Sequence, residues 1–326
     1  MMVSVNDRPL ATLSLDLDNE WAYLKTRGDD TWAALPSYLD RAVGHGLAVF
    51  TDLGVRATWF IVGQDAELPQ HHDALRSLVA AGHEVGNHSF HHEPWINAAT
   101  LDQLAGEFDR TEAAIESATG VRPEGFRGPG YAMSPTLLTV LAARHYRYDA
   151  SSLPTVVGPL ARAYYFRRSR LDERQRAERA ALFGSWHDAA RPLKPYRWRT
   201  PSGPLLELPV TVLPGARVPF HISYVLYLAM RSPTLANRYF SSGLALCRRL
   251  GVVPSILLHP LDVLGGDEVT SLDFFPAMRI PGARNRELVA GWLVTLRDRF
   301  EVQPLGVHAA RLQGAVLREF DVARAA

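Results

Sequence analysis

Two aspartates, Asp16 and Asp18, end a short apolar run near the start of the chain. On a β-strand, residues two apart point to the same side, so their carboxylates would lie close together. Like charges so placed raise a carboxyl pKa unless a cation lies between them. The pair therefore indicates either a metal site that leaves one carboxylate free as a base, or a loop pair that makes turns and caps.

A second stretch is rich in histidine, with His88, His91 and His92 inside five residues. His88 and His92 would share one face of a helical turn, with Cβ atoms about 5–6 Å apart, which suits two imidazoles on one divalent ion. The zinc-protease pattern needs a glutamate where Ser89 stands, so that class of enzyme is disfavoured. His91 is out of phase and is predicted to have no role. The histidines at 71–72 are predicted to be exposed.

Two further motifs contain residues that could take part in catalysis. Residues 127–131 read Arg-Gly-Pro-Gly-Tyr, a tight loop whose backbone N–H groups could stabilise an oxyanion. Arg127 could hold a carboxylate with two hydrogen bonds. His259 follows an apolar run and precedes Asp262 by three residues, which fits a general acid. An ordinary turn and a core histidine are the alternatives.

Short strands alternating with helices must position these residues. Such alternation predicts βαβ units and a mainly parallel sheet, in which polar residues at the carboxyl ends of strands form the site. A mixed-charge stretch at 162–179 is predicted to be a solvated helix. Strands are predicted at 11–17, 57–62, 83–86, 125–127, 147–149, 205–213, 255–258 and 301–303, and helices at 37–53, 74–81, 101–119, 134–143, 223–230, 233–250 and 286–300.

Composition limits the class of protein. The chain has 326 residues, a formal charge of +1 and 47% apolar residues, which indicates a folded globular protein. The near-neutral charge argues against a nucleic-acid binder. The single cysteine, Cys247, excludes an intrachain disulfide and a multi-cysteine metal site, and its apolar surroundings predict a buried thiol. No secretory signal or membrane span is visible, so we expect a soluble cytoplasmic protein.

Taken in chain order, the motifs resemble those of the polysaccharide deacetylase family, also called the NodB-homology family or carbohydrate esterase family 4. The similar segments are SLDLD, ATWFIVG, AGHEVGNHSFHH, GFRGPGY, YDASS and LLHP, which lie between residues 11 and 260. The resemblance implies an α/β fold, a distorted (β/α) barrel with seven parallel strands. It also implies one domain over residues 1–326, with a helical insertion at about 154–251.

The resemblance implies a catalytic metal centre. One divalent ion, usually Zn²⁺ with Mn²⁺ or Co²⁺ as alternatives, would be held by Asp18, His88 and His92. Asp16 would be the general base that activates water, and Arg127 would orient Asp16.

The same resemblance assigns residues around the scissile bond. The backbone N–H of Tyr131 would help to hold the oxyanion, and His259 would protonate the leaving amine. Leu257 would line the pocket for the acyl methyl group, and Pro129 and Asp149 are predicted to lie at the substrate side of the site.

Several assignments stay open at this point. Leu17 separates two aspartates that are adjacent in many members of the family, so the roles of the pair are less certain. Glu20 could compete as a metal ligand. Asp262 is a rival to Asp149 as the partner of His259.

The expected activity is a metal-dependent hydrolase that removes an N-acetyl or N-formyl group from an amino sugar or glycoconjugate. A polyprenyl-linked sugar is a further candidate substrate, and nucleic acid is not expected as a partner. The apolar segment 220–230, with Tyr224 and Tyr227, is either a peripheral membrane contact or a buried helix. The alternatives are hydrolysis of a non-sugar C–N bond, as in allantoinase-like relatives, and a non-catalytic carbohydrate-binding barrel.

Overall fold

Strands and helices alternate along the computed structural model, which describes residues 8–158, 173 and 188–325. The stretch 162–179, predicted as a solvated helix, lies outside these residues apart from residue 173. The strands are β1 (Leu10–Leu17), β2 (Thr58–Ile61), β3 (Glu84–Asn87), β4 (Gly125–Phe126), β5 (Tyr148–Asp149), β6 (Tyr196–Thr200), β7 (Gly203–Glu207), β8 (Ser255–Leu258), β9 (Glu301–Gln303) and β10 (Glu319–Asp321). The α-helices are α1 (Glu20–Arg27), α2 (Leu39–Leu53), α3 (Gly63–Ala66), α4 (His72–Ala80), α5 (Leu101–Thr119), α6 (Pro135–Ala143), α9 (Ile222–Ala229), α10 (Pro233–Leu250), α11 (Gly282–Arg299) and α12 (Leu305–Arg311).

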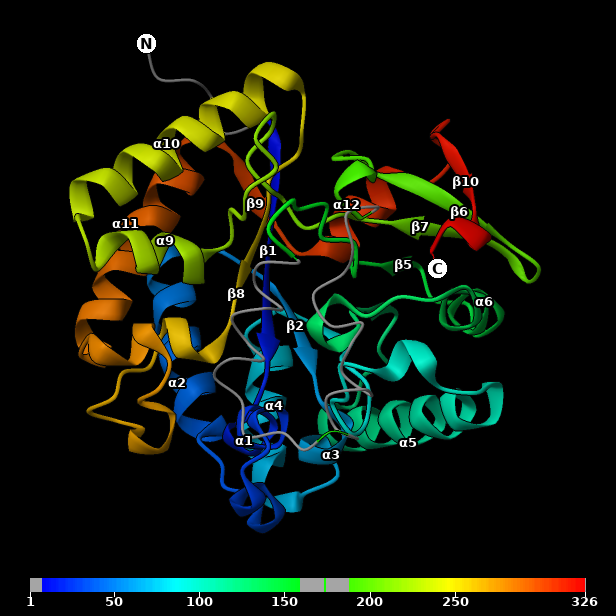
Figure 1. The fold of residues 1–326 in the computed structure, drawn as a ribbon, viewed down its shortest axis with the longest axis horizontal. Helices are drawn as coiled ribbons and strands as arrows, with labels where there is room; N and C mark the ends of the chain where they lie inside the picture. The colour runs from blue at the N-terminus through cyan, green and yellow to red at the C-terminus, as the bar shows by residue number, and fades with distance from the viewer. Residues whose placement is uncertain (1–7, 159–172, 174–187, 326) are drawn as a thin grey trace.

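The strands form one sheet in the order β10-β6-β7-β5-β4-β3-β2-β1-β8, with β9 paired to the start of β1. The seven neighbouring strands from β7 to β8 run parallel, whereas β6 pairs antiparallel with β7. Helices flank this row: α2, α10 and α11 lie on the side of β8, whereas α6 lies beside β5 and α5 lies below α6 in the view (Figure 1). The predicted α/β fold with seven parallel strands is confirmed.

Hydrogen bonds from a loop join the two ends of the parallel row. The chain leaves β7 and runs toward β8, where the Thr211 N–H donates to the carbonyl of Ser255 (3.2 Å). The Ser255 N–H in turn donates to Oγ1 of Thr211 (2.7 Å). Within the described residues β7 and β8 form no ladder, so these contacts take its place. This irregular closure is the distortion of the barrel.

The two faces of β1 carry different kinds of side chain. Leu13, Leu15 and Leu17 pack into a core shared with α2, α4, α9, α10 and α11. The intervening side chains point to the opposite face because successive residues of a strand alternate, and they include Ser14 and Asp16. The leucines of LSLDL thus pack into the core and hold the strand in place, whereas its polar side chains point into the barrel interior.

The range 154–251, predicted to be an insertion, contributes to the sheet and to its cover. It contains β6 and β7, which extend the main sheet, and α9 and α10, which pack beside β8. The single-domain organisation with an insertion stays a prediction. Among the described helices, none combines the length and the hydropathy that crossing a bilayer requires.

Candidate active site

Four parallel strands end at one edge of the sheet, and each delivers a predicted site residue there. Asp16 lies near the end of β1, with Asp18 just beyond it, and His88 follows β3 directly. Arg127 follows β4 and His259 follows β8. Because the strands are parallel, residues far apart in sequence converge at this edge.

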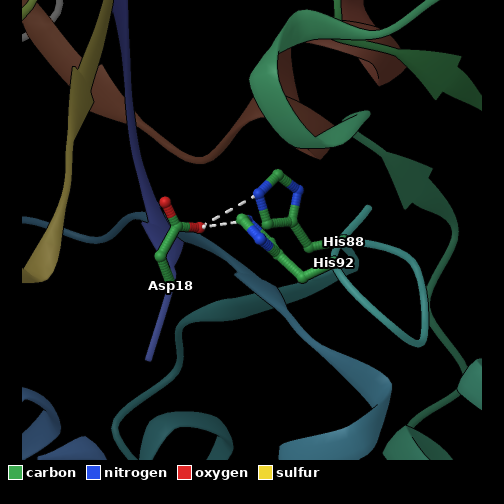
Figure 2. A group of neighbouring side chains, drawn as sticks. All are labelled: Asp18, His88 and His92. Atoms are coloured by element: carbon green, nitrogen blue, oxygen red, sulfur yellow. Dashed lines mark hydrogen bonds and ion pairs between the residues drawn. The ribbon is translucent and has the colours of Figure 1, made fainter. Parts of the chain in front are cut away.

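Asp18, His88 and His92 form a compact buried cluster (Figure 2). Oδ1 of Asp18 lies 3.2 Å from Nε2 of His88 and 3.0 Å from Nε2 of His92. Nδ1 of His88 bonds to the backbone carbonyl of Arg127 at 2.6 Å, which places the proton on Nδ1 and leaves Nε2 with a lone pair. The cluster thus presents one carboxylate oxygen and two imidazole nitrogens to a common point.

The geometry of the cluster fits a divalent metal. Ligands that lie about 2.0–2.1 Å from a tetrahedral ion are separated by roughly 3.3–3.4 Å, close to the two contacts that Asp18 makes. All three ligand atoms lie within 4.8 Å of one another. Two imidazoles and a carboxylate are also the donor set of many zinc enzymes. The predicted ligands are therefore brought together as a metal site requires.

The histidines reach the cluster from a loop and not from the helical turn that their spacing predicted. Residues 88–92 have no helical assignment, and Ser89 and His92 have positive φ angles of 62° and 48°. The side chain of Asn87 accepts a hydrogen bond from the Ser89 N–H at 2.7 Å, and the Ser89 carbonyl accepts one from Gly63 at 2.9 Å. These bonds hold the strained loop, so the two rings meet without the helical turn that their spacing would also allow.

The cluster favours an ionised carboxylate at Asp18. Burial alone would raise the pKa of Asp18, but the charges and hydrogen bonds of His92 and His88 hold it well below its usual range. The backbone carbonyl of Asp18 also accepts a hydrogen bond from Tyr38 Oη at 2.7 Å. The carboxylate is thus charged and held in place, as a metal ligand must be.

A buried arginine, Arg127, holds the carboxylate of Asp16. Nη1 of Arg127 lies 2.6 Å from Oδ1 of Asp16 and also donates to Oγ of Ser14 at 2.9 Å. Nε of the same guanidinium donates to the carbonyl of Ala150, and its plane lies over the ring of Phe60. Arg127 is fully buried, and these contacts hold its guanidinium in this orientation. Oδ2 of Asp16 is left to face the site.

The loop after Arg127 contains the predicted oxyanion donor, Tyr131. The N–H of Tyr131 donates to the carbonyl of Gly128 at 2.9 Å, so in this conformation it is not available to an oxyanion. Tyr131 has a positive φ of 64°, which aims its side chain differently from an ordinary turn residue. Burial and the nearby charge of Asp16 raise the pKa of the Tyr131 phenol well above its usual range. The Tyr131 hydroxyl therefore stays protonated and is the donor that this residue can offer.

His259 points its Nε2 toward Asp16, and hydrogen bonds on its Nδ1 side hold the ring in place. Its Nε2 lies 4.0 Å from Oδ2 of Asp16. Its Nδ1 contacts Oγ of Ser223 at 3.2 Å, and the same Oγ donates to Oδ2 of Asp262 at 3.1 Å. Oδ2 of Asp262 also accepts the backbone N–H of His259 at 2.8 Å. Asp262, acting directly and through Ser223, is thus the carboxylate that supports His259.

Asp149 supports the Gly-Pro-Gly loop instead. It is buried and accepts a hydrogen bond from Oγ of Ser151 at 2.6 Å, while that Oγ accepts the Gly128 N–H at 2.8 Å. Burial and the neighbouring Asp149 raise the pKa of Glu207 well above its usual range, so a protonated Glu207 can donate a hydrogen bond to Asp149. This placement gives Asp149 a positioning role in the loop, and its role at the substrate stays a prediction.

The remaining predicted residues are near the site. Leu257 is buried on β8 directly beside Ser14 of β1, so its side chain shares the interior face that carries Asp16. Pro129 is buried at the start of the short 3₁₀ turn Pro129–Tyr131. Glu20, considered as a rival ligand, instead accepts a hydrogen bond from Ser271 and is not part of the cluster.

Ser223 in the first turn of α9 and His221 just before this helix could not be predicted as site residues. Ser223 contacts His259, as described above, and the ring of His221 lies 5.7 Å from that of His259. Burial, His259 and Arg127 together hold the pKa of His221 well below its usual range, so this imidazole is neutral. No pattern in the sequence links these residues to His259, because packing of α9 beside β8 creates the contact. Ser14 could have been found, since it precedes Asp16 by two residues on the same strand.

Comparisons with known proteins find the same family over part of the chain. Residues 29–148 match the family model described as polysaccharide deacetylase. A peptidoglycan deacetylase-like protein of Gibberella zeae is 31% identical over 128 residues, which are 38% of this chain and 35% of that protein. A peptidoglycan deacetylase of Helicobacter pylori is 31% identical over 121 residues, which are 37% of this chain and 39% of that protein. The chain thus spans little more than a third of the length of these relatives.

The whole fold is similar to a solved structure. The crystal structure of a candidate polysaccharide deacetylase from Mycobacterium smegmatis matches with a TM-score of 0.62 and 20% identity. The match covers 96% of this chain and 94% of that one, so the two share a fold. Together with the family model over residues 29–148, this confirms the resemblance to the polysaccharide deacetylase family that the motifs show.

Proposed function

We propose that this protein is a metal-dependent hydrolase that removes an N-acetyl or N-formyl group from an amino sugar or glycoconjugate. One observation carries the proposal. Asp16, fixed by Arg127 on one oxygen and 4.0 Å from His259 on the other, lies at the same edge as the Asp18–His88–His92 cluster. Amide hydrolysis needs an activated water, stabilisation of the carbonyl oxygen and a proton for nitrogen, and this arrangement supports all three.

The chain's own groups divide these tasks. Asp16 accepts the proton of the attacking water through its free oxygen, while Arg127 holds the carboxylate in position. The phenol of Tyr131 donates a hydrogen bond to the developing oxyanion. His259 delivers a proton to the departing amine nitrogen, and Leu257 lines the space for the acyl methyl group.

Asp18, His88 and His92 would hold one divalent ion. Such an ion supplies a Lewis acid for the amide carbonyl and lowers the pKa of a bound water. Zn²⁺ is the first choice because two imidazoles and one carboxylate suit it, and Mn²⁺ and Co²⁺ are alternatives.

The substrate is proposed from the family and from the names of its members. One relative is named a peptidoglycan deacetylase, which supports N-acetylated amino sugars as the substrate class. Glycoconjugates and polyprenyl-linked amino sugars carry the same acetamido group, and the latter would bring the protein to a membrane surface. Nucleic acid is not proposed as a substrate.

The test is a substrate screen on protein stripped of metal by a chelator and then reloaded with Zn²⁺, Mn²⁺ or Co²⁺. N-acetylated and N-formylated amino sugars, a peptidoglycan fragment and cyclic amides form the panel, and released acetate or formate is measured. We expect acyl release from at least one sugar, and only after metal is added back. Turnover of a cyclic amide alone, or metal-loaded protein that releases no acid from any sugar, would contradict the proposal.

A further inference from the structure

The α9–α10 hairpin has an unusual charge composition. Residues 222–251 contain four arginines and no aspartate or glutamate, in a chain whose 35 basic and 34 acidic residues nearly balance. Figure 1 shows α9 and α10 at the outer edge of the molecule, on the side of β8. A local excess of positive charge on an otherwise neutral protein indicates a surface for an anionic partner.

The four arginines of this hairpin are exposed, and none is paired with an acid in the part of the chain that the structure describes. An exposed row runs along α10 at intervals of three or four residues, namely Arg231, Leu235, Arg238, Ser242, Ala245 and Arg249. No arginine of the hairpin forms a salt bridge with a described residue. The acids of the neighbouring α11, Glu287 and Asp298, are paired with Arg284 and Arg297. Lys194 adds a further cation, since its Nζ lies beside Gly251 at the end of α10.

Apolar side chains project at the turn between the two helices. Tyr227, Met230 and Leu235 are 40%, 37% and 51% exposed. Tyr227 and Met230 stand three residues apart on the outer side of α9, and Leu235 lies in the first turn of α10. Exposed apolar residues beside unpaired arginines are typical of surfaces that lie on lipid.

We propose that this face, made of Tyr227, Met230, Arg231, Leu235, Arg238 and Arg249, docks the protein on an anionic lipid surface. The arginines would contact headgroups and the three apolar side chains would enter the interface between headgroups and acyl chains. A nucleic acid would be attracted by the same arginines but offers no apolar layer for Met230 and Leu235. The apolar tip therefore favours lipid.

The docking face is coupled to the candidate site by α9. His221 and Ser223 at the start of this helix contact His259, and Tyr227 and Met230 lie at its other end. The eight residues of α9 span about 12 Å. Resting on the proposed function, this geometry places the site within reach of an amino sugar attached to a lipid in the docked membrane.

Vesicle sedimentation tests the surface without any turnover. The full chain is mixed with vesicles of phosphatidylcholine containing phosphatidylglycerol, or of phosphatidylcholine alone. We expect binding to the anionic vesicles that weakens as salt is raised. Each arginine at an anionic surface strengthens partitioning about five-fold, so R231E/R238E should bind at least about 25-fold more weakly. M230S/L235S should also bind more weakly, at low salt as well as high.

The opposite end of the sheet offers a matched control. Val316 and Arg318 are exposed beside β10, so V316S/R318E makes a similar change away from the hairpin and should bind vesicles like the unchanged protein. Equal binding of R231E/R238E and the unchanged protein, equal binding to neutral vesicles, or binding to a DNA duplex in place of vesicles would each overturn the proposal. H88A should lose metal and still bind vesicles, and R231E/R238E should process a soluble substrate normally, so the failure of one proposal is distinguishable from the failure of the other.

Discussion

Oγ of Ser223 lies 3.2 Å from Nδ1 of His259 and joins that imidazole to the buried Asp262. If His259 is the general acid, the hydroxyl fixes which way its ring faces Asp16. Ser223→Ala should therefore lower kcat about 5- to 10-fold, the worth of one hydrogen bond, with little change in KM. Ser223→Thr keeps the hydroxyl and should recover most of the loss.

Steady-state kinetics and metal analysis of the same preparations check this. Ser242→Ala, on the exposed side of α10, is the matched control and should behave like the unchanged protein. An unchanged kcat in Ser223→Ala would show that backbone contacts alone position His259. A loss of metal in that variant would point to general disruption of the site.

Mutations should distinguish the proposed metal ligands from the proposed general acid. His88→Ala removes one of three proposed ligands and should abolish stoichiometric metal binding and activity together. His259→Ala should retain the metal and lose turnover. His91→Ala is the control, because His91 bonds to Glu107 away from the cluster, and it should keep both. Metal content by mass spectrometry decides, and full activity in His259→Ala would remove that residue from the mechanism.

Elements with strong local signals could be predicted from the sequence. The helix predicted over 101–119 is observed as Leu101–Thr119 because Thr100 and Gln103 form a capping box and Gly120 ends it in a left-handed conformation. The strand β6, which lies next to the edge strand β10, was missed although its buried Tyr196 and Trp198 alternate with arginines. Helix α1 was missed because it is short and only moderately apolar.

The candidate site likewise has residues that the sequence predicts and contacts that it does not. Asp16, Asp18, His88, His92, Arg127 and His259 stand at strand ends and could be found from motifs. Contacts made by packing could not: His71, predicted to be exposed, is buried against Asp40 and Ser37. Cys247 was predicted correctly, since it is buried in the apolar face of α10, which raises its pKa to about 12.

The Tyr131 hydroxyl offers a direct test of the oxyanion assignment. Because the backbone N–H of Tyr131 is bonded to Gly128, loss of the phenolic oxygen removes the donor that this residue can supply. Tyr131→Phe should lower kcat on the order of a hundred-fold, as removal of one oxyanion donor does in other hydrolases. Tyr224→Phe is the control and should have a smaller effect. An unchanged kcat in Tyr131→Phe would show that other groups stabilise the oxyanion.

The buried Asp262 predicts how stability depends on pH. Burial raises its pKa to about 6, although His259 and Ser223 oppose the shift. Between about pH 4 and pH 6 the folded protein therefore holds a proton that the unfolded chain has released, and stability falls as pH rises through this window. The shift of about two units corresponds to a loss on the order of 3 kcal/mol.

Asp262→Asn should remove this contribution, so the melting temperature of the variant should fall less than that of the unchanged protein between pH 4 and pH 6. The dependence that remains belongs in part to Asp65, whose pKa burial also raises to about 6. Asp273→Asn alters an exposed aspartate and should leave the curve unchanged. Thermal unfolding followed by circular dichroism gives all three curves. Parallel curves for Asp262→Asn and the unchanged protein would mean that Asp262 is ionised throughout this range, and that a charged carboxylate supports His259.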